Sequence, residues 1–179
     1  MNSESGVTLY QTLCQAHPFF WIGGPNVLET DNIERCLRIG REALRVCQKA
    51  RIPYIFKSSF DKANRTSLHS YRGPGLQEGL AMLANIKNVL GVPIITDIHE
   101  PKQAEQIAQV ADIIQIPAFL CRQTDLLVAA ALTGKIIHIK KGQFCGPEVM
   151  IQAARKIQET GNNQVLLGER GTFFGYHDL

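Results

Sequence analysis

The stretch PYIFKSSFDKANR, residues 53–65, is the most informative part of the sequence, because it combines a predicted strand with a cluster of cations. It begins as a run of β-prone apolar residues and then places three cations within residues 57–65. Successive side chains of a strand point to opposite faces, so Lys57 and Ser59 share the face of Ile55. A strand whose inward row changes from aliphatic to cationic is typical of the floor of an anion site. A solvated charged loop after a strand is the alternative.

Strand-like and helix-like segments alternate along the whole chain. Apolar β-prone runs are expected to form strands at 17–24, 53–59, 92–98, 112–117, 135–140 and 164–168. Helical patterns separate them: one begins at Asp31 and Glu34, and four more cover 77–90, 101–110, 123–132 and 147–159. Pro101 and Pro147 fit the first position of a helix, where the missing N–H of proline costs nothing. This alternation predicts a parallel sheet, either doubly wound or closed into a barrel.

Polar residues at the strand ends favour the barrel. A barrel enzyme builds its site from the carboxyl ends of many strands, whereas a doubly wound sheet uses one switch point with a glycine-rich turn. The first turn, Gly23-Gly24-Pro25-Asn26, does not match the glycine-rich pattern GxGxxG. Polar residues instead lie at or just beyond the ends of six successive strands: Asn26, Lys57, Asp97, Gln115, Lys140 and Arg170. We therefore expect an α/β protein of the (β/α)8 TIM barrel class.

The number of strands is lower than this fold requires. A (β/α)8 barrel has eight strands and typically needs about 250 residues, whereas the chain has 179 residues and six visible strands. We expect residues 1–179 to form a single partial barrel domain with an N-terminal extension at 1–17. The chain is expected to lack two βα units.

Composition excludes several classes of protein. The net charge of +3 is too small and too dispersed for a nucleic-acid surface. The first ten residues show no basic segment of a signal peptide, and no run is long enough to span a bilayer. We expect a cytoplasmic protein without membrane contact. The five cysteines show no CxxC spacing and are expected to be free thiols: Cys14, Cys36, Cys47, Cys121 and Cys145.

The cations from different strands suggest an anionic ligand. If the strands close around one mouth, like charges converge, and such convergence is sensible when a ligand with several oxygens lies between them. The alternative is a set of separate surface ion pairs with Asp61, Asp97, Glu100 and Glu169. Asp97 fits proton transfer or an ion pair with Lys57 or Lys140, and both roles can coexist. His99 and His138 are expected to be structural, with His138 packed and hydrogen-bonded.

Several segments resemble one enzyme family. They are WIGGPNVLE (21–29), IFKSSFDKANRTSLHSYRGPGLQEGL (55–80), PIITDIHEP (93–101), IIQIPAFLCRQTDL (113–126), IKKGQF (139–144) and GERGTFFGY (168–176). From about Phe19 to the last residue the chain resembles the 3-deoxy-D-manno-octulosonate 8-phosphate synthases. The resemblance implies a homotetrameric barrel that condenses phosphoenolpyruvate with arabinose 5-phosphate for lipopolysaccharide synthesis. It implies a Gram-negative-type bacterium or a plant as the source.

The resemblance also implies roles for individual residues. Lys62, Lys140 and Arg170 would hold phosphoenolpyruvate, with Gln115 and the backbone of Ala118 beside them. Asn26, Lys57 and Asp97 would face the reacting carbons, and Ser59 would lie near the aldehyde. The sugar phosphate would bind to Asn64, Arg65 and Thr66, where Arg65 could act across a subunit boundary.

No cofactor or metal is expected. A metal-dependent branch of the family has a cysteine at the position of Asn26, and an amide does not replace a thiolate ligand. The other metal ligands of that branch, a histidine and two acids, would lie beyond residue 179. The alternatives are the related synthase that uses erythrose 4-phosphate and an inactive chain that serves as a binding module.

Overall fold

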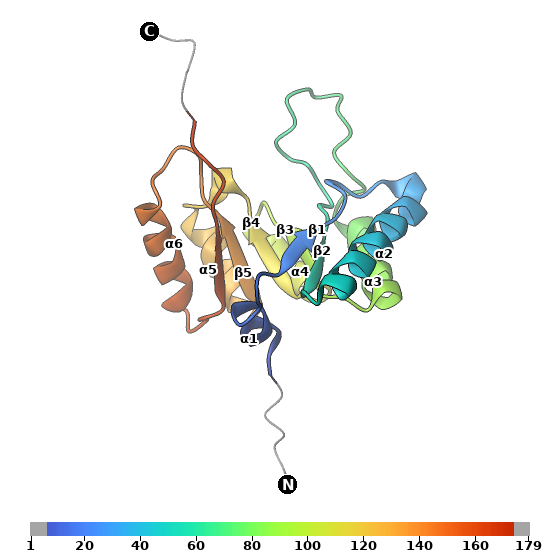
Figure 1. The fold of residues 1–179 in the computed structure, drawn as a ribbon. Helices are drawn as coiled ribbons and strands as arrows, with labels where there is room; N and C mark the ends of the chain where they lie inside the picture. Colours follow the sequence, from blue (N-terminus) through green and yellow to red (C-terminus); the bar gives the residue numbers. More distant parts are fainter. Residues whose placement is uncertain (1–6, 174–179) are drawn as a thin grey trace.

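The structure, a computed structural model, describes residues 7–173. Six parallel strands form one sheet in which each strand lies beside its sequence neighbours, in the order β1-β2-β3-β4-β5-β6. The strands are β1 (Trp21–Gly23), β2 (Tyr54–Lys57), β3 (Ile94–Asp97), β4 (Ile113–Ile116), β5 (Ile136–Lys140) and β6 (Val165–Gly168). A doubly wound sheet would reverse its order at a switch point. The sequential order and the curl of the sheet (Figure 1) are those of a partial (β/α)8 barrel, as predicted.

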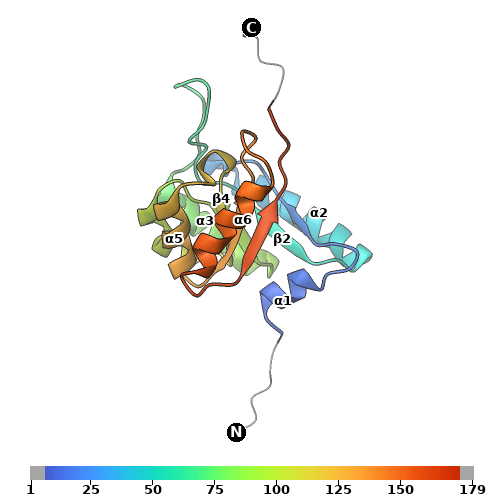
Figure 2. The ribbon, with the colours of Figure 1, turned by 90° about the vertical axis from the view of Figure 1, so that its left-hand side faces the viewer.

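Helices cover the outer face of this curled sheet (Figures 1 and 2). They are α2 (Ile33–Ala50), α3 (Leu76–Leu90), α4 (Ala104–Ala108), α5 (Thr124–Leu132) and α6 (Glu148–Gln158). Short 3-10 turns precede α2, α4 and α5, at Thr30–Asn32, Pro101–Gln103 and Ala118–Leu120. The outward side chains of the strands pack against these helices, for example Phe56 with Leu37 and Leu83. Burial of this apolar surface holds the outer layer together.

The inward side chains form a second, smaller core. Ile55, Ile95, Ile113 and Ile136 come from four neighbouring strands and make one buried layer with Leu13. Leu13 belongs to α1 (Leu9–Cys14), which closes the end of the barrel opposite to the strand-exit loops (Figure 1). The aliphatic layer thus forms the base of the barrel interior, and the next inward residue of each strand lies one level higher.

Most predicted elements are confirmed, and their ends differ in detail. Asn32, not Asp31, caps α2, because its side chain accepts a hydrogen bond from the backbone N–H of Arg35 at 3.2 Å. Pro101 occupies the first position of its 3-10 turn, whereas Pro147 precedes α6 by one residue. The five cysteines are free, as predicted. Within residues 7–173, the helices are too short or too polar to cross a membrane.

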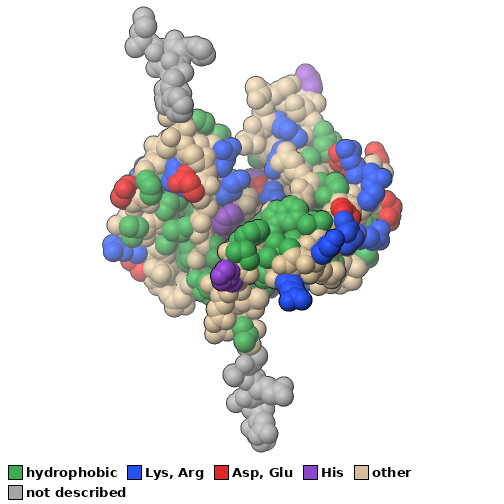
Figure 3. Space-filling model, viewed as in Figure 1, with side chains coloured by type: hydrophobic (Ala, Val, Ile, Leu, Met, Phe, Trp, Pro, Cys, Tyr) green, Lys and Arg blue, Asp and Glu red, His purple; other side chains and the backbone are tan. Residues whose placement is uncertain are grey.

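The sheet has two edges in the described part of the chain, at β1 and β6. Exposed apolar side chains gather beside β1 and along α2, where Trp21, Ile39 and Val46 line a shallow groove (Figure 3). Val46 lies on the outer side of α2 and is 44% exposed. The buried face of α2 is formed instead by residues such as Leu37 and Ala43.

Candidate functional site

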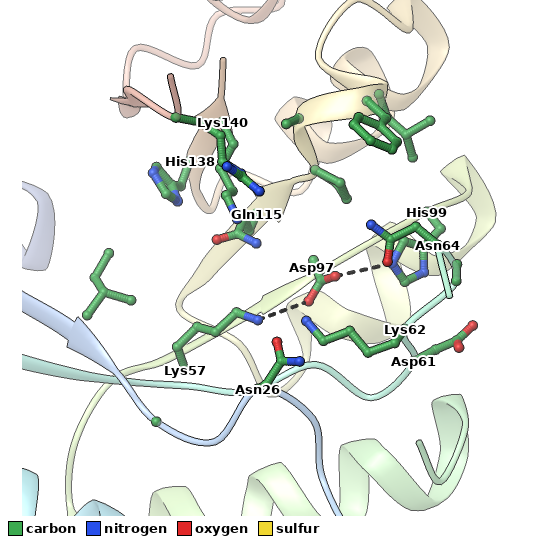
Figure 4. A pocket seen from close by; sticks show the side chains of 18 of the residues that line it. Asn26, Lys57, Asp61, Lys62, Asn64, Asp97, His99, Gln115, His138 and Lys140 are labelled. Atoms are coloured by element: carbon green, nitrogen blue, oxygen red, sulfur yellow. Dashed lines mark hydrogen bonds and ion pairs between the residues drawn. The ribbon is translucent and has the colours of Figure 1, made fainter. Parts of the chain in front are cut away.

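A cavity of about 720 Å³ opens at the carboxyl ends of the strands (Figure 4). Its floor is made by inward side chains that stand one residue pair above the aliphatic layer, such as Lys57 above Ile55 and Asp97 above Ile95. Nine of the residues singled out in the sequence line it: Asn26, Lys57, Lys62, Asn64, Asp97, Gln115, Ala118, Lys140 and Arg170. The alternation of strand residues therefore placed the polar groups at one mouth.

Ser59 lies at the centre of a buried polar network in this floor. Its hydroxyl donates to the carboxylate of Asp97. The same oxygen accepts hydrogen bonds from the ammonium groups of Lys57, at 2.8 Å, and Lys62, at 2.9 Å. Lys57 also lies 3.6 Å from Asp97, and both side chains are largely buried. One hydroxyl thus joins two cations to their counter-charge.

Asp97 is held in its ionised form. Burial by itself raises the pKa of the Asp97 carboxyl. The hydrogen bond from His99, the charge of Lys57 and the hydroxyl of Ser59 lower that pKa by more, so it lies well below the usual range. The Nε2 atom of His99 is 3.2 Å from the carboxylate. At neutral pH Asp97 is therefore a carboxylate that accepts hydrogen bonds.

The cations of the cavity outnumber its acids. Four cations line it, and of the two acids Asp97 and Asp61, the second pairs with Arg72 at 2.5 Å in the loop outside. Burial and then the charge of Lys57 lower the pKa of Lys62 to about 8. Burial, followed by the charges of Lys57 and Arg170, also lowers the pKa of Lys140. The cavity therefore has an excess of positive charge that an anion would relieve.

Comparison with known proteins agrees with this geometry. The family model described as the DAHP synthetase I family matches residues 12–178. The chain belongs to this family. A 2-dehydro-3-deoxyphosphooctonate aldolase of Pisum sativum is 57% identical over 176 residues, which are 98% of this chain and 60% of the relative. The aldolase 1 of Arabidopsis thaliana is 58% identical over 171 residues, 96% of this chain and 58% of the relative.

A bacterial relative shows the same extent of similarity. The 2-dehydro-3-deoxyphosphooctonate aldolase of Bordetella avium (strain 197N) is 56% identical over 162 residues, 90% of this chain and 57% of the relative. That name is a synonym of the synthase that the sequence motifs resemble, so the resemblance is confirmed. The chain spans about 60% of the length of the curated relatives that it matches.

Three of the residues singled out in the sequence do not line the cavity. Ser59 lies beneath it, fully buried. Arg65 and Thr66 are exposed in the loop between β2 and α3, which stands away from the barrel (Figure 1). The Nε of Arg65 donates to the backbone oxygen of Tyr71 at 3.1 Å.

The alternative was that the cations at the strand ends form separate ion pairs with four acids. For three of these acids it is wrong, because each pairs with a cation outside the cavity. Asp61 pairs with Arg72, Glu100 with Lys102 at 2.6 Å, and Glu169 with Lys141 at 3.3 Å. None of these partners lines the cavity. Asp97 is the acid that pairs with a cavity cation, namely Lys57.

The cavity also contains His138, which was expected to be structural, and Gln143, which sequence reasoning missed. His138 was expected to be hydrogen-bonded, but its Nδ1 is buried and has no partner among the described residues. Burial, then the charges of Lys140 and Lys57, lower the pKa of His138 to about 4, so its imidazole is neutral at pH 7. Gln143 follows β5 and is 7% exposed, and its Oε1 also lacks a partner within residues 7–173. His138 shares the inward face of Lys140, one level deeper in the barrel.

The position of Asn26 bears on the metal question. Its amide lies close to the side chains of Lys57 and Lys62 in the cavity (Figure 4). Among residues 7–173, no three His, Cys, Asp or Glu side chains gather in a way that could hold a metal ion. The absence of a metal requirement stays a prediction.

Proposed function

We propose that this chain carries the substrate site of a synthase that condenses phosphoenolpyruvate with arabinose 5-phosphate and water. The products are 3-deoxy-D-manno-octulosonate 8-phosphate and phosphate, for lipopolysaccharide core synthesis. The observation that carries the proposal is the convergence of four cations from different strands and loops on one cavity. A substrate with a phosphate and a carboxylate next to each other matches that charge better than a neutral ligand.

Phosphoenolpyruvate is assigned to the side of the cavity that lies between the cations. Lys62, Lys140 and Arg170 bind its phosphate and carboxylate, in which Arg170 offers a bidentate fork and the lysines point charges. Gln115 and the backbone of Ala118 lie beside the bound anion. Binding replaces the repulsion between these cations with attraction, and this gain fixes the orientation of the substrate.

The reaction joins the enol carbon of phosphoenolpyruvate to the aldehyde carbon of the sugar. As this bond forms, the aldehyde oxygen gains negative charge, which Lys57 stabilises as a cationic hydrogen-bond donor. Water then attacks the former enol carbon, and phosphate leaves with cleavage of the C–O bond. Asp97 and Asn26 face the reacting carbons, and Ser59 holds Lys57 and Asp97 in register next to the aldehyde.

The sugar phosphate is assigned to Asn64, Arg65 and Thr66 in the loop between β2 and α3. Asn64 lines the cavity, whereas Arg65 and Thr66 are exposed and do not line it. An exposed anion site at the tip of a projecting loop suits the mouth of a neighbouring copy. This arrangement favours an assembly of several copies, which we propose to be a homotetramer. The proposal also includes a cytoplasmic location and chemistry without a metal.

The test is the choice of aldose phosphate. The measured protein is a chimera in which residues 1–179 continue, in register, into the remaining part of the pea relative. Phosphate release from phosphoenolpyruvate should require arabinose 5-phosphate and be far slower with erythrose 4-phosphate. Equal or faster release with erythrose 4-phosphate would favour the related synthase. A folded chimera that releases no phosphate would favour a binding module.

A further inference from the structure

Lys141 is a buried lysine that follows directly after the cavity residue Lys140. It is 3% exposed. Its ammonium group donates to the backbone oxygens of Gly171, at 2.7 Å, and of Gly142 and Cys145, both at 3.2 Å. It also lies 3.3 Å from the carboxylate of Glu169. Four oxygens thus surround one buried ammonium, which agrees with the rule that a buried charge needs hydrogen-bond partners.

These oxygens belong to two different loops. Gly142 and Cys145 lie in the loop after β5, and Glu169 and Gly171 lie in the segment after β6. A backbone hydrogen bond of 3.1 Å from Phe173 to Gln143 joins the same two segments. Lys141 therefore connects the exits of two neighbouring strands.

Arg170 stands between the two residues that Lys141 holds after β6. The carboxylate of Glu169 also accepts from the N–H groups of Arg170, at 2.8 Å, and Gly171, at 2.6 Å, so it closes a tight turn around Arg170. The φ angle of Gly171 is +75°, a left-handed conformation that suits glycine. The backbone of Arg170 is thereby fixed from both sides.

Arg170 needs such a tether because its surroundings repel it. Its charge is one cause of the lowered pKa of Lys140, so the two cations lie close enough to oppose each other. β6 is an edge of the described sheet, and the segment that follows it is exposed. Without a tether, the guanidinium would move toward solvent and away from Lys140.

We propose that Lys141 is a positioning residue that keeps Arg170 in the cavity and so sets the affinity for phosphoenolpyruvate. The inference rests on the proposed function, since Arg170 is assigned there to this anion. Lys141 itself does not touch the substrate, because its ammonium points to the backbone of the two loops.

The experiment measures the dissociation constant of phosphoenolpyruvate by calorimetry, with the chimera that continues into the pea relative and with its variants. Lys141→Met should weaken binding about tenfold, the size expected when a charge-assisted hydrogen bond to the ligand is impaired. Lys87→Met is the matched control. Lys87 makes the same kind of contacts, to the backbone oxygen of Val110 at 2.9 Å and to Asp112 at 2.8 Å, but at the opposite end of the strands. It should leave the affinity unchanged.

A double-mutant cycle separates positioning from a structural role. In an Arg170→Ala background, Lys141→Met should cause no further loss of affinity, because the group that it positions is absent. If Lys141→Met does not fold, Glu169→Ala takes its place, since the Glu169 side chain is 65% exposed. Equal effects in both backgrounds, or an unchanged affinity in a folded single variant, would overturn the inference. If the chimera without these substitutions does not bind phosphoenolpyruvate, the proposed function itself fails.

Discussion

The hydroxyl of Ser59 donates to the carboxylate of Asp97, and it does so from the point where two lysine ammonium groups meet. Lys57 and Lys62 both donate to this hydroxyl. The oxygen is therefore surrounded by two donors and one acceptor, and Ser59 is fully buried. Such a network stabilises the fold while all its hydrogen bonds are formed. Loss of its central hydroxyl leaves buried charged groups without a hydrogen-bond partner.

The neighbouring serines allow a controlled test of that network. Ser59→Ala should lower the free energy of unfolding by about 1–3 kcal/mol, because buried charged groups lose a partner. Ser58 is also fully buried, yet its hydroxyl has no partner among the described residues, so Ser58→Ala should cost much less. Denaturant titration of both variants checks this. Equal destabilisation by the two changes would show that the network contributes nothing.

Lys62 should make anion binding dependent on pH. With a pKa of about 8, it is protonated below that pH and increasingly neutral above it. A bound anion favours the ammonium form, so binding near pH 8.5 should take up protons, and affinity should fall as the pH rises above 8. Calorimetry in two buffers of different ionisation enthalpy measures the uptake.

The Lys62→Met variant is the control for this prediction, and Lys62 itself should also affect stability. Proton uptake should fall in Lys62→Met, and its persistence at the full value would contradict the assignment. The native pKa lies below the unfolded value of about 10.4, so this lysine destabilises the native state most below pH 8. Between these two values its unfavourable contribution fades as the pH rises.

Two cations should give different kinetic signatures in the chimera with the pea relative. Arg65→Ala should mainly raise the KM for arabinose 5-phosphate, since a phosphate remote from the reacting carbon is bound similarly in the ground and transition states. Lys57→Ala should mainly lower kcat, by roughly 10²-fold, if it stabilises the growing charge on the aldehyde oxygen. Steady-state kinetics with each substrate varied in turn checks both. Normal kinetics with only a lower Tm would reduce both residues to structural roles.

The chemistry should not depend on a metal. Asn26 offers a neutral amide where the metal-dependent branch has a thiolate. Activity of the chimera should therefore survive prolonged treatment with a chelator. Loss of activity on chelation, with recovery when a divalent transition metal is added, would contradict this prediction.

The sequence predicted those parts of the site that obey the periodicity of a strand. Lys57, Asp97 and Lys140 could be placed at one mouth because each shares its face with an isoleucine of the inner layer. The sequential order of the strands followed from the same argument about strand ends. These inferences needed only local alternation and a parallel sheet.

What the sequence did not reveal depends on contacts between distant segments. The four oxygens around Lys141 come from two loops, and no local pattern marks a lysine that binds carbonyl groups. The pairing of Asp61 with Arg72 across the base of a loop was missed because loops have no periodicity. Helix α1 also had no clear signal in the sequence, because its burial depends on an aliphatic layer that four separate strands build.

In the proposed reaction, this cavity joins phosphoenolpyruvate to a sugar aldehyde with cleavage of the C–O bond of the phosphate ester. The most direct test runs the chimera with phosphoenolpyruvate and arabinose 5-phosphate in ¹⁸O-water and determines the label in both products by mass spectrometry. The octulosonate product should gain ¹⁸O, and the released phosphate should not. Label in the phosphate, without a new sugar acid, would mean that water attacks phosphorus and would contradict the proposed reaction.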